Sequence, residues 1–578
     1  MECINQIIRH AYRNFFWGGP SREREISFAG GKTAFEYLDK SLFEPVPVFV
    51  DSFGGFILLQ KELMYSSEIR EFYPAPGVQK DGFKAYIESF PELAAAEVPG
   101  EAGRLIAPAE FKNHFDFAFL AMHGPDCEDG AIQGLLEWYK IPYSGPGLMG
   151  SAVGIDKILQ NEMIALVNGQ EKKSWTLKYS QWVPKDYPLL FQVLRKHLGL
   201  PLVIKAPHQG SSIGVAIVKG DSLEEFVSAV NQCFFQTELD AETWKALDEA
   251  EKLAWAQKIA NLDEGIGFPV ILGDKTIYHP TTLISELEIH FSGGNSHALL
   301  SSSNAEDQVL IEEFVNGQEF SCGCIQFDDG SPLALPPSEV IKMVEVFDFN
   351  TKYKPGASRK RTPVDTTLEK NREIQQMIAA TFQQLGINSC VRIDGFLTEN
   401  GTILLHDPNT IPGMSPTSFI FKQMAEIGLN VTQALTYLIR QSLRERIRTG
   451  KQTWALRALL EKLDHRIAAH VAAAKPEEYI VFDSTDEAYT EARRRYGLLN
   501  AEGKVRPVPV LKAADGHFYK LPNPLMFKEY VSDVEALLHA ERHPLLVETS
   551  QKAAPLTAFF AGQVSYDITR IDDPALLS

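Results

Sequence analysis

Residues 390–414 read CVRIDGFLTENGTILLHDPNTIPGM, two strand-like runs on either side of Asn400 and Gly401. Asn-Gly is the strongest short signal for a two-residue hairpin turn, because both turn positions need a positive φ. We therefore predict a β-hairpin here, and the position of its turn fixes which side chains lie on each face.

Four polar side chains are predicted to share one face of this hairpin. A two-residue turn places Asp394 opposite Asp407 and Arg392 opposite Asn409. Facing carboxylates destabilise a strand pair, whereas Mg²⁺ binds carboxylate and amide oxygens. The pattern indicates a Mg²⁺–nucleotide site on Asp394, Asp407 and Asn409. A solvated polar face is the alternative, and the following turn TIPGM favours the site.

The composition is that of a globular protein with an acidic charge balance. Of 578 residues, 44% are hydrophobic and 23% charged, and 56 basic against 75 acidic residues give a net charge of −19. This charge disfavours general nucleic-acid binding, because phosphate contacts dominate that affinity. Six scattered cysteines indicate a reducing compartment. No apolar run approaches the roughly 20 residues of a membrane span, and no secretory signal is visible, so we expect a cytoplasmic protein with no membrane partner.

Working outward along the chain, helical and strand-like runs alternate, which indicates an α/β or α+β protein. The segment 201–219 is predicted to be two strands around a Gly/Ser turn. A Gly/Ser-rich linker is expected at 143–154. Residues 257–305 are expected to be irregular or weakly paired, and 419–441 helical. A first boundary is expected near residue 150, and the character changes again after residue 446.

The Gly/Ser turn carries a second group of candidate residues. Glycines let backbone N–H groups approach phosphate, and hydroxyls with a lysine complete a cradle. The order of a Walker loop is absent, and Gly/Ser turns between strands are common, so the segment by itself is a weak signal. The residues concerned are Lys205, Gly210, Ser211, Ser212 and Gly214.

Three other loops carry charged residues that could serve a site. Glu23 follows a Gly turn after the first strand-like run, where open α/β sheets bind ligands, although a helix N-terminus rich in Glu is the simpler interpretation. His123 precedes several carboxylates and could equally be structural. Lys352 and Tyr353 lie before a basic stretch that is either a solvated loop or a lid.

Nine segments in chain order, between about residues 11 and 445, resemble the D-alanine–D-alanine ligases of the ATP-grasp superfamily. Single pieces are weak signals, but nine in the same order are specific. They are GGPSREREIS, HGPDCEDGAIQGLLE, IPYSG, SAVGIDK, IKAPHQGSSIGV, VLIEEFVNGQEF, FDFNTKY, VRIDGF and DPNTIPGMSPTSF.

The resemblance implies an ATP-grasp fold with an N-terminal Rossmann-like domain. It implies that ATP phosphorylates one D-alanine and that the amine of a second attacks the acyl phosphate, supplying a dipeptide for peptidoglycan. ATP and two Mg²⁺ ions are the cofactors implied, and a homodimer is one assembly to test. The divisions expected are a substrate domain at 1–150, a central subdomain at 151–311 with an insertion at about 236–300, a catalytic subdomain at 312–445 and an extension at 446–578.

The resemblance also implies a role for each matching residue. Nucleotide contacts fall to Lys157 and Lys205 on the phosphates, the turn Ser211–Gly214 with Ser212 over them, Glu312 at the adenine and Glu319 at the ribose. Asp394, Asp407 and Asn409 hold Mg²⁺, while Arg392 and the N–H of Gly413 stabilise the oxyanion. Glu23 is implied to bind the ammonium of the first D-alanine, with His123 nearby, and Ser418, beside Phe419, to bind the carboxylate of the second. Lys352 is implied to approach the transferred phosphate. Glu23, Ser211 and Tyr353 are implied to form a hydrogen-bonded set.

The sequence departs from the family pattern at several places. Asp407 stands where the family has Glu, and Cys127 replaces a glycine. The insertion and the extension have no counterpart in compact family members, and we expect them to pack on the core or form an oligomer contact. Three functions therefore stay open: a D-alanine–D-alanine ligase, a ligase joining other D-amino or hydroxy acids, and a nucleotide-binding regulator that has lost catalysis.

Overall fold

The computed structural model describes residues 12–79, 82–93, 100–342, 358–450 and 453–572, and its first unit is a five-stranded α/β sheet. Strand β1 runs parallel to β2 and β5, whereas β3 and β4 continue the sheet antiparallel, in the order β4-β3-β2-β1-β5. The elements are β1 (Tyr12–Gly18), α2 (Arg24–Tyr37), β2 (Phe43–Val50), β3 (Phe56–Leu59), β4 (Gly103–Ile106), α3 (Phe111–His114), β5 (Leu120–Ala121) and α4 (Ala131–Tyr139).

The carboxyl end of β1 turns on two glycines. Gly18 and Gly19 have φ of +93° and +104°, a conformation that favours glycine. A Cβ at Gly19 would lie 2.5 Å from the sulfur of Cys127, so the two loops that follow β1 and β5 pack directly on each other. Parallel strands bring these loops to one edge of the sheet, where open α/β sheets bind ligands.

A second sheet, in the order β6-β13-β7-β8, forms the central unit. Its β7 and β8 are antiparallel neighbours, which confirms the predicted strand pair in 201–219. The linker expected at 143–154 is instead partly helical. The elements are α5 (Leu148–Ile155), α6 (Lys157–Asn168), β6 (Ser174–Lys178), α7 (Tyr187–Leu198), β7 (Leu202–Lys205), β8 (Val215–Val218), α8 (Leu223–Cys233) and β13 (Gln308–Glu313).

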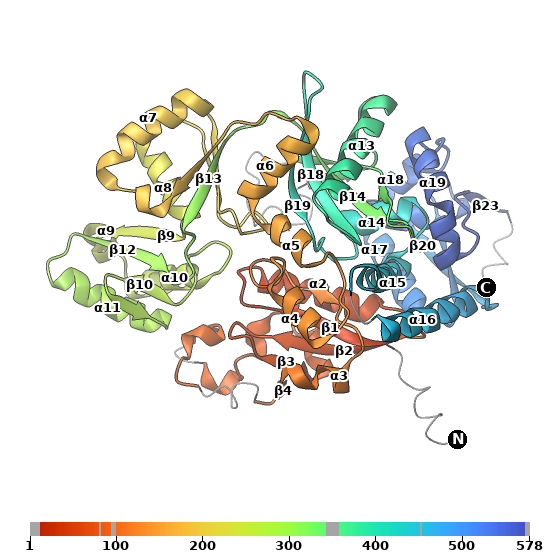
Figure 1. Cartoon of the computed structure of the whole chain (residues 1–578), viewed down its shortest axis with the longest axis horizontal. Helices are drawn as coiled ribbons and strands as arrows, with labels where there is room; N and C mark the ends of the chain where they lie inside the picture. The colour runs from red at the N-terminus through yellow and green to blue at the C-terminus, as the bar shows by residue number, and fades with distance from the viewer. Residues whose placement is uncertain (1–11, 80–81, 94–99, 343–357, 451–452, 573–578) are drawn as a thin grey trace.

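The expected insertion is a small α/β lobe beside the central sheet (Figure 1). The segment 257–305, expected to be irregular or weakly paired, does contain two paired strands of only three residues. It also contains a 13-residue helix and a six-residue strand that the expectation missed, because the Gly, Ser and Asn clusters mark only the turns between elements. Trp244, Leu283 and Leu300 are fully buried in an apolar core of this lobe. Its elements are β9 (Gln236–Asp240), α9 (Ala241–Ala246), α10 (Glu249–Ala260), β10 (Val270–Leu272), β11 (Lys275–Ile277), α11 (Pro280–Ser292) and β12 (His297–Ser302).

The largest sheet, β17-β16-β14-β18-β19 with β15 beside β14, carries the hairpin. The helix expected over 419–441 is two helices, because Gly428 (φ +95°) ends one and Asn430 caps the next. The elements are β14 (Gly317–Gln326), β15 (Pro332–Ala334), β16 (Ser338–Lys342), β17 (Ser358–Arg361), α13 (Leu368–Gln384), β18 (Cys390–Thr398), β19 (Ile403–Asn409), α14 (Phe419–Glu426) and α15 (Val431–Thr449).

The hairpin forms, but its register differs from the prediction at one place. Arg392 faces Asn409 as predicted, whereas Asp394 faces His406 and not Asp407. Leu397 pairs with Ile403, so the turn has three residues and not the predicted two. The extra residue shifts the pairing of β18 with β19 by one position. A β-bulge, in which Asp407 has φ 45°, restores the predicted register at Arg392 and Asn409.

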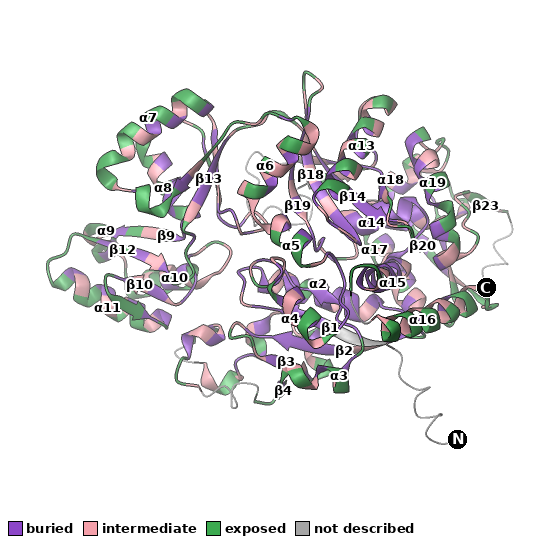
Figure 2. Ribbon diagram, in the orientation of Figure 1, coloured by how far each residue is buried: buried purple, intermediate pink, exposed green. Residues whose placement is uncertain are grey.

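The C-terminal extension adds a further sheet, β20-β21-β22-β23. Its buried Ile480, Tyr489 and Met526 belong to the same apolar core as Phe16 of the first unit and Leu435 of α15, so the extension packs on the core (Figure 2). The elements are α16 (Trp454–Ala472), β20 (Glu477–Asp483), α17 (Asp486–Glu502), β21 (Arg506–Lys512), β22 (Phe518–Lys520), the 3₁₀ helix η8 (Asn523–Phe527), α18 (Val531–Leu537), α19 (Pro544–Ala561) and β23 (Thr569–Ile571). None of the helices within the described ranges has the length and hydropathy that a bilayer crossing requires.

Candidate functional site

One pocket joins the first unit, the central unit and the hairpin. Its lining includes Glu23 from the loop after β1, Lys157 at the start of α6, Gln209 from the Gly/Ser turn, and Asp407 with Asn409 from β19. Residues far apart in the sequence therefore converge on one polar cavity. The groups around it are described below from the N-terminal loop to the hairpin.

Glu23 links the first unit to the Gly/Ser turn. The hydroxyl of Ser211 donates to Glu23 Oε1 at 2.6 Å, and the N–H of Gly210 donates to Oε2 at 3.2 Å. Burial raises the pKa of the Glu23 carboxyl, and Glu128 raises it further. A buried pair of carboxylates of this kind favours a cation beside it.

His123 lies against the same pair of acids. Its Nδ1 is 3.7 Å from Glu128 Oε2, and the other oxygen of Glu128 accepts from the N–H of Ile411 at 3.1 Å. Burial lowers the pKa of His123, but Glu128 and Glu23 outweigh it and the net shift is upward. The two acids thus favour the protonated form of this histidine.

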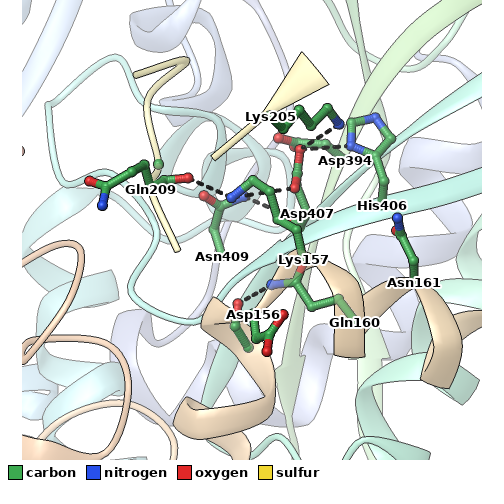
Figure 3. A network of polar contacts seen from close by, with 12 residues as sticks. Asp156, Lys157, Gln160, Asn161, Lys205, Gln209, Asp394, His406, Asp407 and Asn409 are labelled. Carbon is green, nitrogen blue, oxygen red and sulfur yellow. Dashed lines mark hydrogen bonds and ion pairs between the residues drawn. The ribbon is translucent and has the colours of Figure 1, made fainter. Parts of the chain in front are cut away.

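Two lysines, of which Lys157 lines the pocket, face Asp407 (Figure 3). Lys157 Nζ and Lys205 Nζ each lie 3.7 Å from a carboxylate oxygen of Asp407, and Lys157 also donates to the carbonyl of Gln209 at 2.5 Å. Burial would raise the pKa of Asp407, but the lysines hold it well below its usual range. The bulge aims Asp407 at the lysines, which come from two other elements.

Glu312 continues this charge network away from the hairpin. Its carboxylate binds Lys172 at 2.7 Å and Lys205 at 3.0 Å, and it accepts from Asn161 Nδ2 at 2.6 Å. Burial would raise its pKa, yet the lysines lower it to about 2. Glu312 is thus a buried anion that aligns Lys205.

Arg392 and Asp394 form a fork on β18. Arg392 Nε and Nη2 donate to the two oxygens of Asp394, each at 3.0 Å, and Ser321 Oγ donates to Oδ1 at 2.6 Å. A bidentate guanidinium–carboxylate pair fixes both side chains. The hairpin therefore presents an oriented Arg next to the carboxylates.

The donor set suits Mg²⁺ in its chemistry. Asp394 and Asp407 would supply carboxylate oxygens, although both oxygens of Asp394 also accept from Arg392. Asn409 Nδ2 donates to the carbonyl of Asp407 at 2.7 Å, so the amide oxygen of Asn409 would be the ligand. Within the described part of the chain, no three His, Cys, Asp or Glu side chains gather as a metal site. An ion held here would therefore need further oxygen ligands from water or phosphate.

The remaining predicted residues that the structure describes are not part of the lining of this pocket. Ser212 and Gly214 have positive φ in the Gly/Ser turn, and Glu319 lies on β14. Gly413, Ser418 and Phe419 follow the hairpin, with Ser418 immediately before α14. Lys352 and Tyr353 lie outside the described residues.

Several residues of the site were missed by the sequence reasoning. His208 Nδ1 lies 2.9 Å from Glu306 Oε2 and its Nε2 lies 3.8 Å from Asp156 Oδ2, while Gln209 Nε2 donates to Glu306 Oε1 at 2.9 Å. Asp156 caps α6 and could have been recognised as a cap before an apolar helical run. No local pattern marks Glu306.

Arg22, next to Glu23, was also missed, and it ties this site to the inserted lobe. Its Nη2 donates to the carbonyl of Ile266 at 2.7 Å and to Ser302 Oγ at 2.9 Å, and its guanidinium lies 3.6 Å from the ring centre of Phe235. Burial lowers its pKa to about 9. The inserted lobe thus holds the loop that carries Glu23.

Two family models match this chain, the D-ala D-ala ligase N-terminus at residues 14–146 and the D-ala D-ala ligase C-terminus at residues 289–440. A D-alanine–D-alanine ligase of Geobacillus thermodenitrificans is 22% identical over 427 residues, 74% of this chain and 94% of that protein. A D-alanine–D-alanine ligase A of Brucella melitensis is 26% identical over 436 residues, with coverage of 74% and 96%. The solved D-alanine–D-alanine ligase of Coxiella burnetii has a TM-score of 0.50 at 20% identity and covers 78% of this chain and 99% of its own, which supports the fold.

Proposed function

This chain belongs to the D-alanine–D-alanine ligase family, and we propose that it joins two D-alanines at the expense of ATP for peptidoglycan synthesis. The observation that carries the proposal is the single pocket that brings Glu23 together with Lys157 and Asp407. Glu23, which would bind an amino acid, and Lys157, which would bind phosphate, line this pocket with Asp407 from three structural units. This is the arrangement that an ATP-dependent carboxylate–amine ligase requires.

The reaction would begin by transfer of the γ-phosphoryl group of ATP to a carboxylate oxygen of the first D-alanine, with ADP leaving. The amine of the second D-alanine would attack the carbonyl carbon, lose a proton and expel phosphate as the amide bond forms. Lys157 and Lys205 would hold phosphate oxygens under the turn that contains Ser211 and Ser212. Arg392 and the N–H of Gly413 would stabilise the tetrahedral oxyanion.

Glu23 would bind the ammonium of the first D-alanine. Support comes from the buried acids Glu23 and Glu128, whose mutual repulsion a bound cation would relieve. His123, whose pKa is raised, would lie near the carboxylate of the first D-alanine. Ser418 and Phe419 would receive the second D-alanine, because Ser418 precedes the amino end of α14, which suits a carboxylate.

Mg²⁺ would bind at Asp394, Asp407 and Asn409, and we propose two ions. When bound, Mg²⁺ neutralises the phosphate charge that develops as the phosphoryl group moves. Glu312 would meet the adenine end and Glu319 the ribose. Lys352 would approach the transferred phosphate, and Tyr353 would form a hydrogen-bonded set with Glu23 and Ser211. Asp407 already lies between the lysines that would contact the same phosphates, which supports this placement.

A second candidate is a ligase of the same class with another acceptor. No residue in the described ranges excludes D-serine or D-lactate at Ser418 and Phe419, so the acceptor is a matter for experiment. The retained Arg392 speaks against a regulator without catalysis, because a pure nucleotide binder has no use for an oxyanion stabiliser.

The domain divisions at 1–150, 151–311, 312–445 and 446–578 are part of the proposal. They are supported by the separate sheets of the first, central and hairpin units. A cytoplasmic location is proposed because the reaction consumes ATP. A homodimer is proposed from exposed apolar side chains near α4 and α5, among them Trp138 and Met149, and sedimentation would test it.

The experiment is phosphate release from ATP and Mg²⁺ with D-alanine, L-alanine, D-serine and D-lactate supplied in turn. Release with D-alanine alone, together with a dipeptide product, is expected. Release only with a different acceptor would move the function to the second candidate. ATP binding without release in every mixture would contradict ligase activity.

A further inference from the structure

The C-terminal extension contacts helix α14 through two ion pairs of opposite polarity. Lys422 Nζ lies 2.7 Å from Glu529 Oε2, and Glu426 Oε1 accepts from Lys528 Nζ at 2.6 Å. Lys422 and Glu426 are four residues apart and share one face of the helix. Two successive residues of the extension thus match an opposite-charge pattern on α14.

These pairs are set in the protein interior. The side chains of Lys422 and Glu426 are 8% and 6% exposed, so each buried charge depends on its partner. Burial and the nearby Lys360 together lower the pKa of Lys422 to about 8, although the Glu529 carboxylate acts in the opposite direction. Loss of either extension residue would leave an uncompensated charge against α14.

The face of α14 next to this one is fixed to the sheet that carries the hairpin. Gln423 Oε1 accepts from the N–H of Gly323 at 2.7 Å, and its Nε2 donates to the carbonyl of Ser321 at 2.8 Å. Ser321 in turn donates to Asp394, a proposed Mg²⁺ ligand. The helix therefore contacts both the sheet that carries Asp394 and the extension.

A third contact reaches the start of the helix. Arg359 of β17 forms an ion pair with Asp533 of the extension. The next residue, Lys360, lies with Nζ 4.8 Å from the ring centre of Phe419 and 3.5 Å from the carbonyl of Thr417. The extension thus holds both the strand and the helix that border Ser418 and Phe419.

We propose that Lys528 and Glu529 are positioning residues for the acceptor side of the site. By holding α14 against the hairpin, they set where Ser418 and Phe419 meet the second D-alanine. The extension is then a part of the catalytic unit and not a separate module. This inference rests on the proposed function, since it assigns the acceptor to the start of α14.

The test compares Glu529→Gln and Lys528→Gln with the native chain. Each neutral variant should raise the KM for the second D-alanine by about 10-fold, with the KM for ATP little changed, because the acceptor alone is misplaced. Glu529→Asp, which keeps the charge, should recover most of the affinity. Glu491→Gln is the matched control, because it breaks the exposed Glu491–Arg494 pair on α17 of the same extension.

Hydrogen exchange supplies a readout that does not depend on turnover. Amides of α14 should exchange faster in Glu529→Gln and Lys528→Gln than in the native chain or Glu491→Gln. If Glu529→Gln does not fold, Lys528→Gln carries the same comparison, since it leaves the Lys422–Glu529 pair in place. In an active enzyme, an unchanged KM for the second D-alanine together with unchanged hydrogen exchange would overturn the inference. A native chain without ligase activity would overturn the proposed function. Hydrogen exchange would then still test whether the extension stabilises α14.

Discussion

Ser211 Oγ donates a hydrogen bond of 2.6 Å to Glu23 Oε1, across 188 residues of sequence. It joins the turn proposed to cover phosphate to the acid proposed to bind the amino-acid ammonium. Both proposed substrates would therefore be held by loops that contact each other directly. Because of this hydrogen bond, a substrate that orders one loop also helps to position the other loop.

Removing this hydrogen bond should impair the coupling of the two substrates. Ser211→Ala is expected to lower kcat/KM for D-alanine by about 10-fold or more, with ATP affinity changed far less. Ser211 has φ 54°, so Ser211→Gly separates the lost hydroxyl from backbone strain. Equal losses in both variants implicate the hydroxyl, and steady-state kinetics that match the native enzyme would count against the role.

The Arg392–Asp394 fork makes a second prediction. Arg392→Ala should lower turnover by about 10²-fold or more while leaving ATP binding largely intact, because it removes stabilisation of transition-state charge. Arg392→Lys keeps the charge but cannot form the two 3.0 Å bonds to Asp394, and should recover only part of the rate. Turnover would be measured by phosphate release and ATP affinity by calorimetry. An unchanged turnover in Arg392→Ala would remove it from this role.

Asp407 should respond differently to loss of charge and to added length. Asp407→Asn removes the anion between Lys157 and Lys205 and should raise the Mg²⁺ concentration for half-maximal activity by about 10-fold or more. Asp407→Glu should keep or raise activity. Because residue 407 has φ 45°, a conformation that Asp adopts more easily than Glu, this variant should lower the free energy of unfolding by about 1 kcal/mol. Mg²⁺ titrations and thermal unfolding check both. A collapse of activity in Asp407→Glu would mean that the site is built around the shorter side chain.

His208 should give the fold a measurable pH dependence. The neighbouring carboxylates of Asp156 and Glu306 raise the pKa of His208 from 6.5 to about 10. Since the folded-state pKa lies above the unfolded one, the stabilisation is complete below pH 6.5 and is lost as pH rises through about 10. The side chain is 33% exposed, and allowing for solvent screening, we expect the difference to be on the order of 1 kcal/mol.

The measurement is denaturant unfolding of the native chain and of His208→Gln between pH 6 and about 10. The native chain should lose stability across this window relative to the variant. Parallel pH profiles for the two proteins would show that the His208 contacts do not stabilise the fold.

The hairpin shows how far the sequence could lead. The strand pair and the partnership of Arg392 with Asn409 followed from alternation and from Asn400-Gly401. The partner of Asp394 did not follow, because a longer turn and a bulge each shift the register by one, and tertiary contacts to Asp407 decide where the bulge lies.

Long-range partners were beyond local reasoning for a different reason. Glu306 and Arg22 acquire their roles from segments that are close only in the folded chain. Periodicity and turn signals describe neighbours along the sequence, so they identify Asp156 as a cap but cannot pair Lys422 with Glu529. In the inserted lobe, strands of three residues are too short to show alternation.

The most direct test of the central claim follows oxygen through the reaction. The enzyme is incubated with ATP, Mg²⁺ and D-alanine that carries ¹⁸O in its carboxylate, and the phosphate and amino-acid products are analysed by mass spectrometry. An acyl-phosphate ligase transfers one donor carboxylate oxygen to phosphate, so we predict ¹⁸O-labelled phosphate in equal amount to D-alanyl-D-alanine. Unlabelled phosphate, or phosphate without dipeptide, would contradict the proposed function.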